Sequence, residues 1–205
     1  MTSENSSLSE QQQDVLRELG NVGAGHAATA LSVLLGQTVR MSVTAARLCE
    51  FDEISDVVGG TEVPVVGIFL QLNGGLHGSM FLLLPLSSAR QLLRHLHLPV
   101  DSEEGLSDLE MSALAEVGNI LSGSYLTAIA EMSSLVLQLS VPAVALDMAG
   151  AILDVGFMLS GDVADRAILI NTSIWQGDRS VDGHFFMLPH PESMAPLFAA
   201  LGCSL

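Results

Sequence analysis

A glutamate and an asparagine three residues apart occur twice in this sequence, as Glu18 with Asn21 and as Glu116 with Asn119. On a helix, residues three apart lie on the same face, one turn from each other. A carboxylate can pair with a cation, and a carboxamide can both donate and accept hydrogen bonds without titrating. Asparagine is a poor helix former because its side chain competes for backbone hydrogen bonds. An asparagine that weakens its helix in both copies indicates that the Glu–Asn pair has a function.

The two pairs belong to an internal duplication, because Glu18 and Glu116 stand 98 positions apart and their surroundings align at the same offset. Residues 14–44 match residues 112–142 without a gap. The matched positions are Gly20/Gly118, Val22/Ile120, Gly25/Gly123, Thr29/Thr127, Ala30/Ala128, Ser42/Ser140 and Val43/Val141. Chance rarely aligns so many positions at one offset, so two copies of one structural unit are expected.

Each copy is predicted to contain a long helix, strands and a shorter helix. Ser9 with Gln12 has the sequence of a capping box, and Gly36 is a natural stop, so the first long helix is expected to end near Leu35. The other expected elements are a strand at 38–45, a loop at 50–62, a hairpin of 63–72 and 76–84, a helix at 87–96, an acidic connector at 99–104, a helix at about 107–134, a strand after it, two strands around 176–183 and a helix at 191–201.

The predicted fold class is α+β, an α/β sandwich with a pseudo-twofold axis. One antiparallel sheet is expected to be packed on one face by the two long helices, with the two shorter helices added. A single domain is expected over residues 1–205, made of repeats at about 8–98 and 106–205. The first long helix contains several glycines, including Gly20 and Gly23, which weaken a helix by up to about 1 kcal/mol each relative to alanine. Close approach by another backbone is the expected compensation.

The composition excludes some classes of partner. The formal net charge is −16, and all seven cationic side chains are arginine. Nucleic acids and anionic membrane surfaces need a basic face, so neither is expected as a partner, whereas basic proteins are plausible ones. Hydrophobic residues make up 49% of the chain and charged residues only 15%. Since about 25% charged is usual, a wide buried interface between the halves or an apolar partner surface is expected.

No targeting or membrane-spanning segment is predicted, and a cytoplasmic location is expected. Residues 1–13 lack the basic and apolar regions of a signal peptide. Residues 135–161 are long and apolar enough to be considered for a membrane span, but Asp147 and Asp154 within them would be costly in a bilayer. Cys49 and Cys203 have no metal-binding or redox spacing, so free buried thiols are expected.

Other motifs give no support for a different chemistry. His95 and His97 are separated by one residue, but on a helix their imidazoles diverge, so surface histidines are expected rather than a metal site. The sequence contains no nucleophile elbow, phosphate-binding loop or zinc-protease motif. A serine hydrolase, an NTPase and a metalloprotease therefore lack the residues that would carry their reactions.

The repeated pattern resembles the signature of the CheC family of chemotaxis phosphatases, which includes CheX and the phosphatase part of FliY. That signature is Asp or Ser, then Glu four residues later and Asn three beyond it, with a proline after twenty-two further residues. Residues 18–32, Glu-Leu-Gly-Asn-Val-Gly-Ala-Gly-His-Ala-Ala-Thr-Ala-Leu-Ser, are similar to the first copy in CheC. The resemblance covers nearly the whole chain. Two positions depart from the pattern: Thr44 replaces the proline of the first copy, and Ser112 is the accepted alternative to the acid in the second.

The resemblance implies removal of phosphate from the aspartyl phosphate of a CheY-type response regulator. Asn21 and Asn119 would each orient a water for in-line attack. Glu18 and Glu116 would dock against the regulator, most simply by pairing with its active-site lysine; a catalytic-base role for the glutamates is the alternative. The phosphorylated regulator would supply Mg²⁺, so no metal or other cofactor is expected on this chain.

The resemblance also implies partners other than the regulator. CheC relatives bind CheD, a deamidase of chemoreceptors, so CheD is an expected second partner, and a monomer is the family default. A competing hypothesis is a non-catalytic binding module of the chemotaxis and flagellar switch machinery, that is, a CheD-binding adaptor. The high apolar content and low charge would suit that role.

Overall fold

A computed structural model describes residues 8–98, 105–161 and 166–203. Its core is one seven-stranded sheet in the order β1-β6-β7-β3-β2-β4, with β5 also pairing with β2. Every strand pair is antiparallel. The elements are α1 (Glu10–Leu35), β1 (Arg40–Glu50), the 3-10 turn η1 (Phe51–Glu53), α2 (Ile54–Val57), β2 (Pro64–Gly74), β3 (Gly78–Pro85), α3 (Leu86–His95), α4 (Asp108–Ser133), β4 (Leu137–Leu139), β5 (Ala143–Met148), α5 (Ala149–Ser160), β6 (Arg166–Gln176), β7 (Arg179–Pro189) and α6 (Pro191–Ala200).

The two long helices begin and end at equivalent residues. The capping box predicted at Ser9 is confirmed, and Ser107 repeats it at the start of α4. In each box the serine side chain accepts from a backbone N–H of the first turn, which satisfies a donor that has no partner within the helix. The helices end at Gly36 and Ser134, both in the left-handed conformation. Each helix therefore has 26 residues, with the same local signals at both ends.

The sheet repeats the duplication in its strand order and its register. Read from one edge the strands are β1, β6 and β7, and read from the other edge they are β4, β2 and β3. The central strands β7 and β3 pair with each other, so the two halves of the sheet meet there. Met41 of β1 pairs with Ile174 of β6, and the equivalent Leu139 of β4 pairs with Leu72 of β2. The predicted α+β fold with an internal pseudo-twofold arrangement is confirmed.

The position that carries Thr44 in the first half and Pro142 in the second interrupts the sheet in both. In β1 the register shifts between Val43 and Ala45, as in a β-bulge. In the second half the equivalent strand is divided into β4 and β5, and Pro142 lies in the gap between them. Proline has no backbone N–H, so it fits where the ladder is already broken. Ser140 closes the gap, because its N–H donates to Gln71 O at 2.9 Å and its Oγ accepts from Gln71 N at 2.9 Å.

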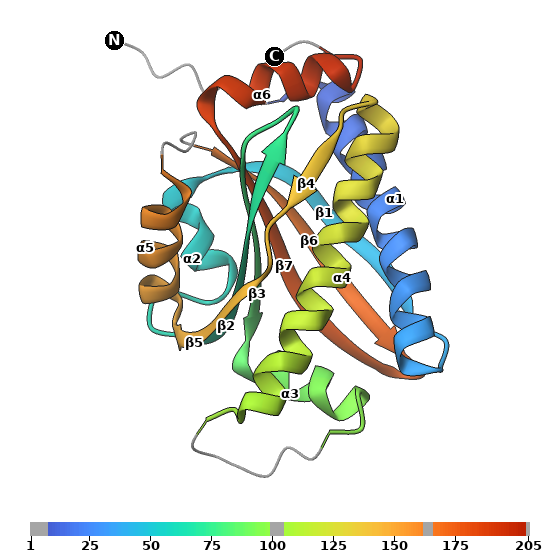
Figure 1. Ribbon diagram of the computed structural model, residues 1–205, viewed down its shortest axis with the longest axis vertical. Coiled ribbons are helices and arrows are strands. Elements are labelled where there is room, and N and C mark those ends of the chain that lie inside the picture. The colour runs from blue at the N-terminus through green and yellow to red at the C-terminus, as the bar shows by residue number, and fades with distance from the viewer. Residues whose placement is uncertain (1–7, 99–104, 162–165, 204–205) are drawn as a thin grey trace.

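The two long helices lie side by side and antiparallel over one face of the sheet, with α6 across one end and α3 at the other (Figure 1). Leucines of both helices, such as Leu16 and Leu114, are fully buried against apolar side chains of the sheet. Gly23 lies against the ring of Tyr125 on the neighbouring helix. The expectation that another backbone would approach these glycines is thus wrong at Gly23, where an aromatic side chain fills the space.

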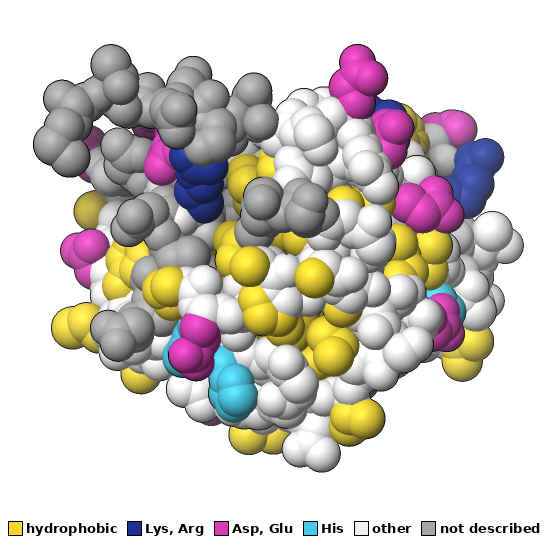
Figure 2. All heavy atoms as spheres, turned by 90° about the horizontal axis from the view of Figure 1, so that it is seen from above, with side chains coloured by type: hydrophobic (Ala, Val, Ile, Leu, Met, Phe, Trp, Pro, Cys, Tyr) yellow, Lys and Arg dark blue, Asp and Glu magenta, His cyan; other side chains and the backbone are white. Residues whose placement is uncertain are grey.

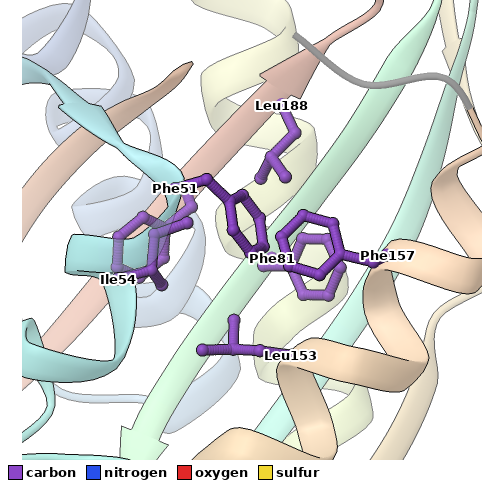
Figure 3. A pocket seen from close by; sticks show the side chains of 7 residues that line it. Phe51, Ile54, Phe81, Leu153, Phe157 and Leu188 are labelled. Carbon is purple, nitrogen blue, oxygen red and sulfur yellow. The ribbon is translucent and has the colours of Figure 1, made fainter. Parts of the chain in front are cut away.

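The opposite face of the sheet is covered by η1, α2 and α5, which were not expected from the sequence. Residues 50–62 were expected to form a loop, and no helix was expected in residues 135–161. Phe51 and Phe157 point toward each other beside Phe81 of β3, with aliphatic side chains around them (Figure 3). The apolar character of α5 thus serves packing on the sheet. None of the helices described is both long and apolar enough to cross a membrane.

Two smaller predictions can also be compared with the structure. The expectation of a surface histidine is wrong for His95, which is only 4% exposed, and right for His97, which is exposed. His95 is buried because it lies on the face of α3 that packs on the sheet. Cys49 and Cys203 are free and buried, as expected. The connector at 99–104 lies outside the described residues.

Candidate functional site

The first Glu–Asn pair lies on a stripe of α1 that faces away from the sheet. The exposed residues Asp14, Glu18, Asn21, Gly25 and Thr29 recur every three or four positions, which is the spacing of one helix face. The buried positions of the same helix, from its start, are Gln12, Leu16, Leu19, Gly20, Gly23, Ala24, Ala27 and Leu31. The core therefore holds α1 by its opposite side, and the pair is presented outward on a rigid element.

The second pair lies on the equivalent stripe of α4. Ser112, Glu116, Asn119 and Thr127 are exposed, and Gly123 is partly exposed. Each threonine of the two stripes donates from Oγ1 to the carbonyl of the glycine one turn earlier, at 3.0 Å in α1 and 2.9 Å in α4. The two stripes therefore share their Glu, Asn, Gly and Thr residues and the hydrogen bond from threonine to glycine.

The four side chains of the two pairs are free to contact another molecule. Within the described ranges, no hydrogen bond or ion pair holds the side chain of Glu18, Asn21, Glu116 or Asn119. A buried polar group of this kind would need a partner inside the protein, whereas these groups are exposed to solvent. An exposed amide on a helix that is anchored in the core can be inserted into a partner without first breaking an internal bond.

Glycine is the residue that sequence reasoning did not connect to the site. A Cβ atom added to Gly25 or Gly123 would meet nothing within 4 Å, so packing inside the chain does not require glycine at either position. By contrast, a Cβ on Gly118 would lie 2.6 Å from Ile68 Cγ2, so that glycine is needed for packing on β2. The duplication could have indicated these glycines, because Gly25/Gly123 and Thr29/Thr127 are identical residues at equivalent positions on the stripes of the Glu–Asn pairs.

The structure does not bring the two pairs together into one site. Because Gly23 contacts Tyr125 and the helices are antiparallel, Gly25 and Gly123 lie at the same level along the helix pair. Asn21 lies four residues before Gly25, and Asn119 lies four residues before Gly123. Because the helices run in opposite directions, the two asparagines lie on opposite sides of the level of the glycines. At 1.5 Å per residue, the two asparagines are about 12 Å apart along the helix direction. The arrangement is two separate Glu–Asn sites, one per half.

The surroundings of the two sites differ in charge. Arg17 Nη1 lies 2.9 Å from Asp14 Oδ1, so the first site is flanked by an exposed ion pair. The equivalents in the second site, Ser112 and Ala115, are uncharged. Glu116 also lines a groove of about 430 Å³ formed by the end of α1, the residues that follow α3 and the start of α4. The second site is therefore the more apolar of the two.

The described residues offer no metal site of their own. No group of three or more His, Cys, Asp or Glu side chains in them could hold a metal ion. Basic side chains are also few on the end of the molecule that carries α6, where acidic and apolar side chains lie between uncharged surface (Figure 2). What the sites can supply is a carboxamide, for orienting a water, and a carboxylate, for pairing with a cation.

Comparison with known proteins finds a family pattern in most of each long helix and in the strand residues that follow it. The model of the CheC-like family matches residues 12–43 and 109–146, which include both Glu–Asn pairs. A protein of Bacillus subtilis (strain 168) named CheY-P phosphatase CheC is 46% identical over 203 residues, which is 97% of this chain and 97% of that protein.

Solved structures have the same fold. Thermotoga maritima FliY matches with a TM-score of 0.74 and 20% identity, over 95% of this chain and 98% of that one. CheX from Borrelia burgdorferi, in a complex described as CheX-CheY-BeF3-Mg+2, matches with a TM-score of 0.52 and 15% identity, over 85% of this chain and 99% of the other. At these identities the likeness concerns the fold alone.

Proposed function

Because this chain belongs to the CheC-like family, we propose that it removes the phosphoryl group from the aspartyl phosphate of a CheY-type response regulator. The single observation that carries this function is the pair of exposed, unbound Glu–Asn couples on two equivalent, firmly capped helices. The relative that is 46% identical over nearly its full length is named for the same reaction. The enzyme is thus a hydrolase whose substrate is another protein.

Asn21 and Asn119 position the water. In hydrolysis of an acyl phosphate, the water oxygen forms a bond to phosphorus as the bond to the aspartyl oxygen breaks. Enzymes accelerate such phosphoryl transfer mainly by positioning and by charge neutralisation. A carboxamide that accepts a hydrogen bond from the water while donating one to a phosphoryl oxygen would hold the two in line. Such orientation contributes up to about 7–11 kcal/mol in the best model systems.

Glu18 and Glu116 dock the substrate. Each lies one helical turn before its asparagine on the same exposed face, so each reaches the partner surface beside the phosphate. The simplest cation for this carboxylate is the lysine of the regulator's phosphorylation pocket. Pairing there orients the regulator and leaves the asparagine aimed at the phosphate.

Mg²⁺ enters with the regulator. The Borrelia burgdorferi complex contains BeF3 and Mg²⁺ together with CheX and CheY, which supports a metal that travels with the phosphorylated partner. This chain would add only a carboxamide and a carboxylate from each site to the regulator's phosphorylation pocket. We expect EDTA to abolish the reaction, and Mg²⁺ alone to leave the melting temperature of the isolated protein unchanged.

The function is tested by measuring loss of phosphate from a ³²P-labelled CheY-type regulator. Wild type should increase the rate, each single variant Asn21→Ala and Asn119→Ala should retain activity through the other site, and the double variant should return the rate to that of the regulator alone. Gln138→Ala, which removes an exposed amide on β4, is the matched control and should behave as wild type. A double variant with wild-type activity would exclude the mechanism, and would leave a non-catalytic binding module as the explanation of the family likeness.

CheD is proposed as a second partner. The helix α5 displays exposed apolar side chains at Val155, Met158 and Leu159, on the opposite side of the sheet from α1 and α4. A partner bound there would leave both Glu–Asn sites open. Calorimetric titration with CheD, with and without regulator, tests this proposal. We also propose that the protein is a monomer in the cytoplasm, which sedimentation at several concentrations and fractionation of cells would test.

A further inference from the structure

The groove beside the second site is lined by three segments that are far apart in the sequence. They are the end of α1, the residues that follow α3 and the first turns of α4. Its lining includes Leu34 and Leu35 of α1, Leu96 and Leu98 after α3, and Leu109 and Glu116 of α4. Most of these side chains are aliphatic, and Leu34 and Leu109 remain 45% and 63% exposed. Exposed leucines at a concave surface indicate a binding site for an apolar group.

The groove is continuous with the second Glu–Asn site. Glu116 lies on its rim, and Ser112 belongs to the same outward stripe of α4. Ser112 precedes Asn119 by seven residues, which is about 10 Å along the helix. A specific protein interface covers about 800 Å² on each partner, a patch with a radius of roughly 16 Å. An interface of this size that is centred on Asn119 also covers the groove residues around Ser112.

The first site has a polar contact where the second has apolar groove residues, although both sites are built from equivalent elements. Gln11 of α1 stands at the position of Leu109, and its Nε2 donates to Gly202 O at 3.4 Å. The helix α6 is the equivalent of α3, and Gly202 follows α6 just as Leu96 to Leu98 follow α3. The hydrogen bond from Gln11 to Gly202 therefore joins the two segments that correspond to the walls of the groove. Cys203, in the segment after α6, is only 8% exposed and packs in the core. A polar bridge and a flanking ion pair replace the apolar surface at the first site.

We propose that this groove is a specificity subsite that takes an aliphatic side chain from the surface of the phosphorylated regulator, so that the second site binds the regulator more tightly than the first. The proposal rests on the proposed function and concerns how its two sites differ. Burial of an aliphatic side chain strengthens binding, so loss of this contact should raise the KM of the second site roughly tenfold, which corresponds to about 1.4 kcal/mol. The turnover number should change little, because the groove does not reach the reacting atoms.

The test uses Leu109→Gln, which places in the second half the residue found at the equivalent position of the first. In the Asn21→Ala background, where only the second site works, the substitution should raise KM for the phosphorylated regulator roughly tenfold and leave kcat nearly unchanged. The Kd for the regulator loaded with beryllofluoride and Mg²⁺ should rise by the same factor. Val33→Gln is the matched control, since Val33 is 80% exposed on α1 and does not line the groove; its KM should stay at the wild-type value.

The same substitution in the Asn119→Ala background separates a local effect from a general one. There the first site does the work, and KM should be unaffected by Leu109→Gln. An unchanged KM in the Asn21→Ala background would overturn the subsite while leaving the phosphatase function intact. Equal effects in both backgrounds would overturn it as well, because they would report altered folding. A change in sedimentation caused by Leu109→Gln would also overturn it and assign the groove to a second copy of the chain. If phosphate loss is independent of both asparagines, the proposed function itself fails.

Discussion

Tyr125 of α4 lies directly over Gly23 of α1, so closely that a Cβ atom added to the glycine would clash with Cδ1 of the ring. The ring is 1% exposed, stacks on Phe185 of the sheet, and its hydroxyl is 2.9 Å from Thr172 Oγ1. Burial raises the pKa of Tyr125 to about 12. The contact fixes how the two site-bearing helices lie relative to each other, because the ring cannot move away without losing its other partners.

Gly23→Ala is therefore expected to destabilise the protein by about 1–3 kcal/mol, the usual cost of overpacking a filled core. Urea denaturation followed by circular dichroism measures the change. Gly25→Ala is the matched control on the same helix, where the added methyl group meets nothing. It should raise stability by up to about 1 kcal/mol, because alanine is the better helix former. Equal effects of the two substitutions would show that the Tyr125 contact does not constrain the helix pair.

Thr44→Pro is expected to be tolerated. Thr44 occupies the bulge of β1, and its equivalent in the second half is already Pro142. The loss of stability should stay below about 1 kcal/mol, and phosphatase activity should persist, because proline fits where a ladder is interrupted. Val43→Pro is the control: Val43 pairs with Thr172 and its side chain lies over Gly20, so this change should cost more stability than Thr44→Pro. Similar losses of stability for both variants would show that Thr44 does not occupy an interruption of the strand ladder.

Gly25→Gln and Gly123→Gln together are expected to keep or increase stability and to slow dephosphorylation by roughly tenfold or more, which corresponds to about 1.4 kcal/mol of transition-state stabilisation. Both positions are open, and both lie one turn beyond an asparagine on the proposed docking surface. A long side chain there would hold the regulator's backbone away from the amide. Rates of phosphate loss and thermal melts of the same samples check the two effects. Full activity of a well-folded double variant would show that the regulator does not cover these glycines.

Acid should destabilise the protein partly through His95. Burial, with a contribution from Arg179, lowers the pKa of this imidazole below its ordinary value of about 6.5. The unfolded chain then binds more protons than the native protein, so stability falls as the pH drops below about 6.5. His95→Leu should reduce the loss of stability between about pH 7 and pH 5. His97→Asn, which removes an exposed imidazole two residues away, should leave that loss unchanged; identical pH profiles for all three proteins would exclude His95 as a source.

Much of the fold was predictable because its signals are local. The limits of α1 and α4 depend on capping residues within one turn of each end, and such signals act in any context. The duplication likewise required only that residue types recur at one offset. Apolar residues on the other face of each helix show which side is buried, which is why Glu18, Asn21, Glu116 and Asn119 lie on the exposed side. The roles of these four residues stay a prediction.

Other features depend on which segments meet in three dimensions. Val43 and Val141 are the same residue at equivalent positions, yet one lies over Gly20 and the other is 89% exposed. The helix α5 was missed because a short apolar run fits a buried strand or a buried helix equally well. The groove forms only where the end of α1, the residues after α3 and the start of α4 come together. No local sequence pattern predicts that these three segments meet.

The repeated helices and the chemistry that they carry could thus be read from the chain before it is folded, since both follow from residue type and spacing. The difference between the two sites could not. It arises only in the folded molecule, because the burial and the neighbours of a residue depend on what distant parts of the chain place beside it.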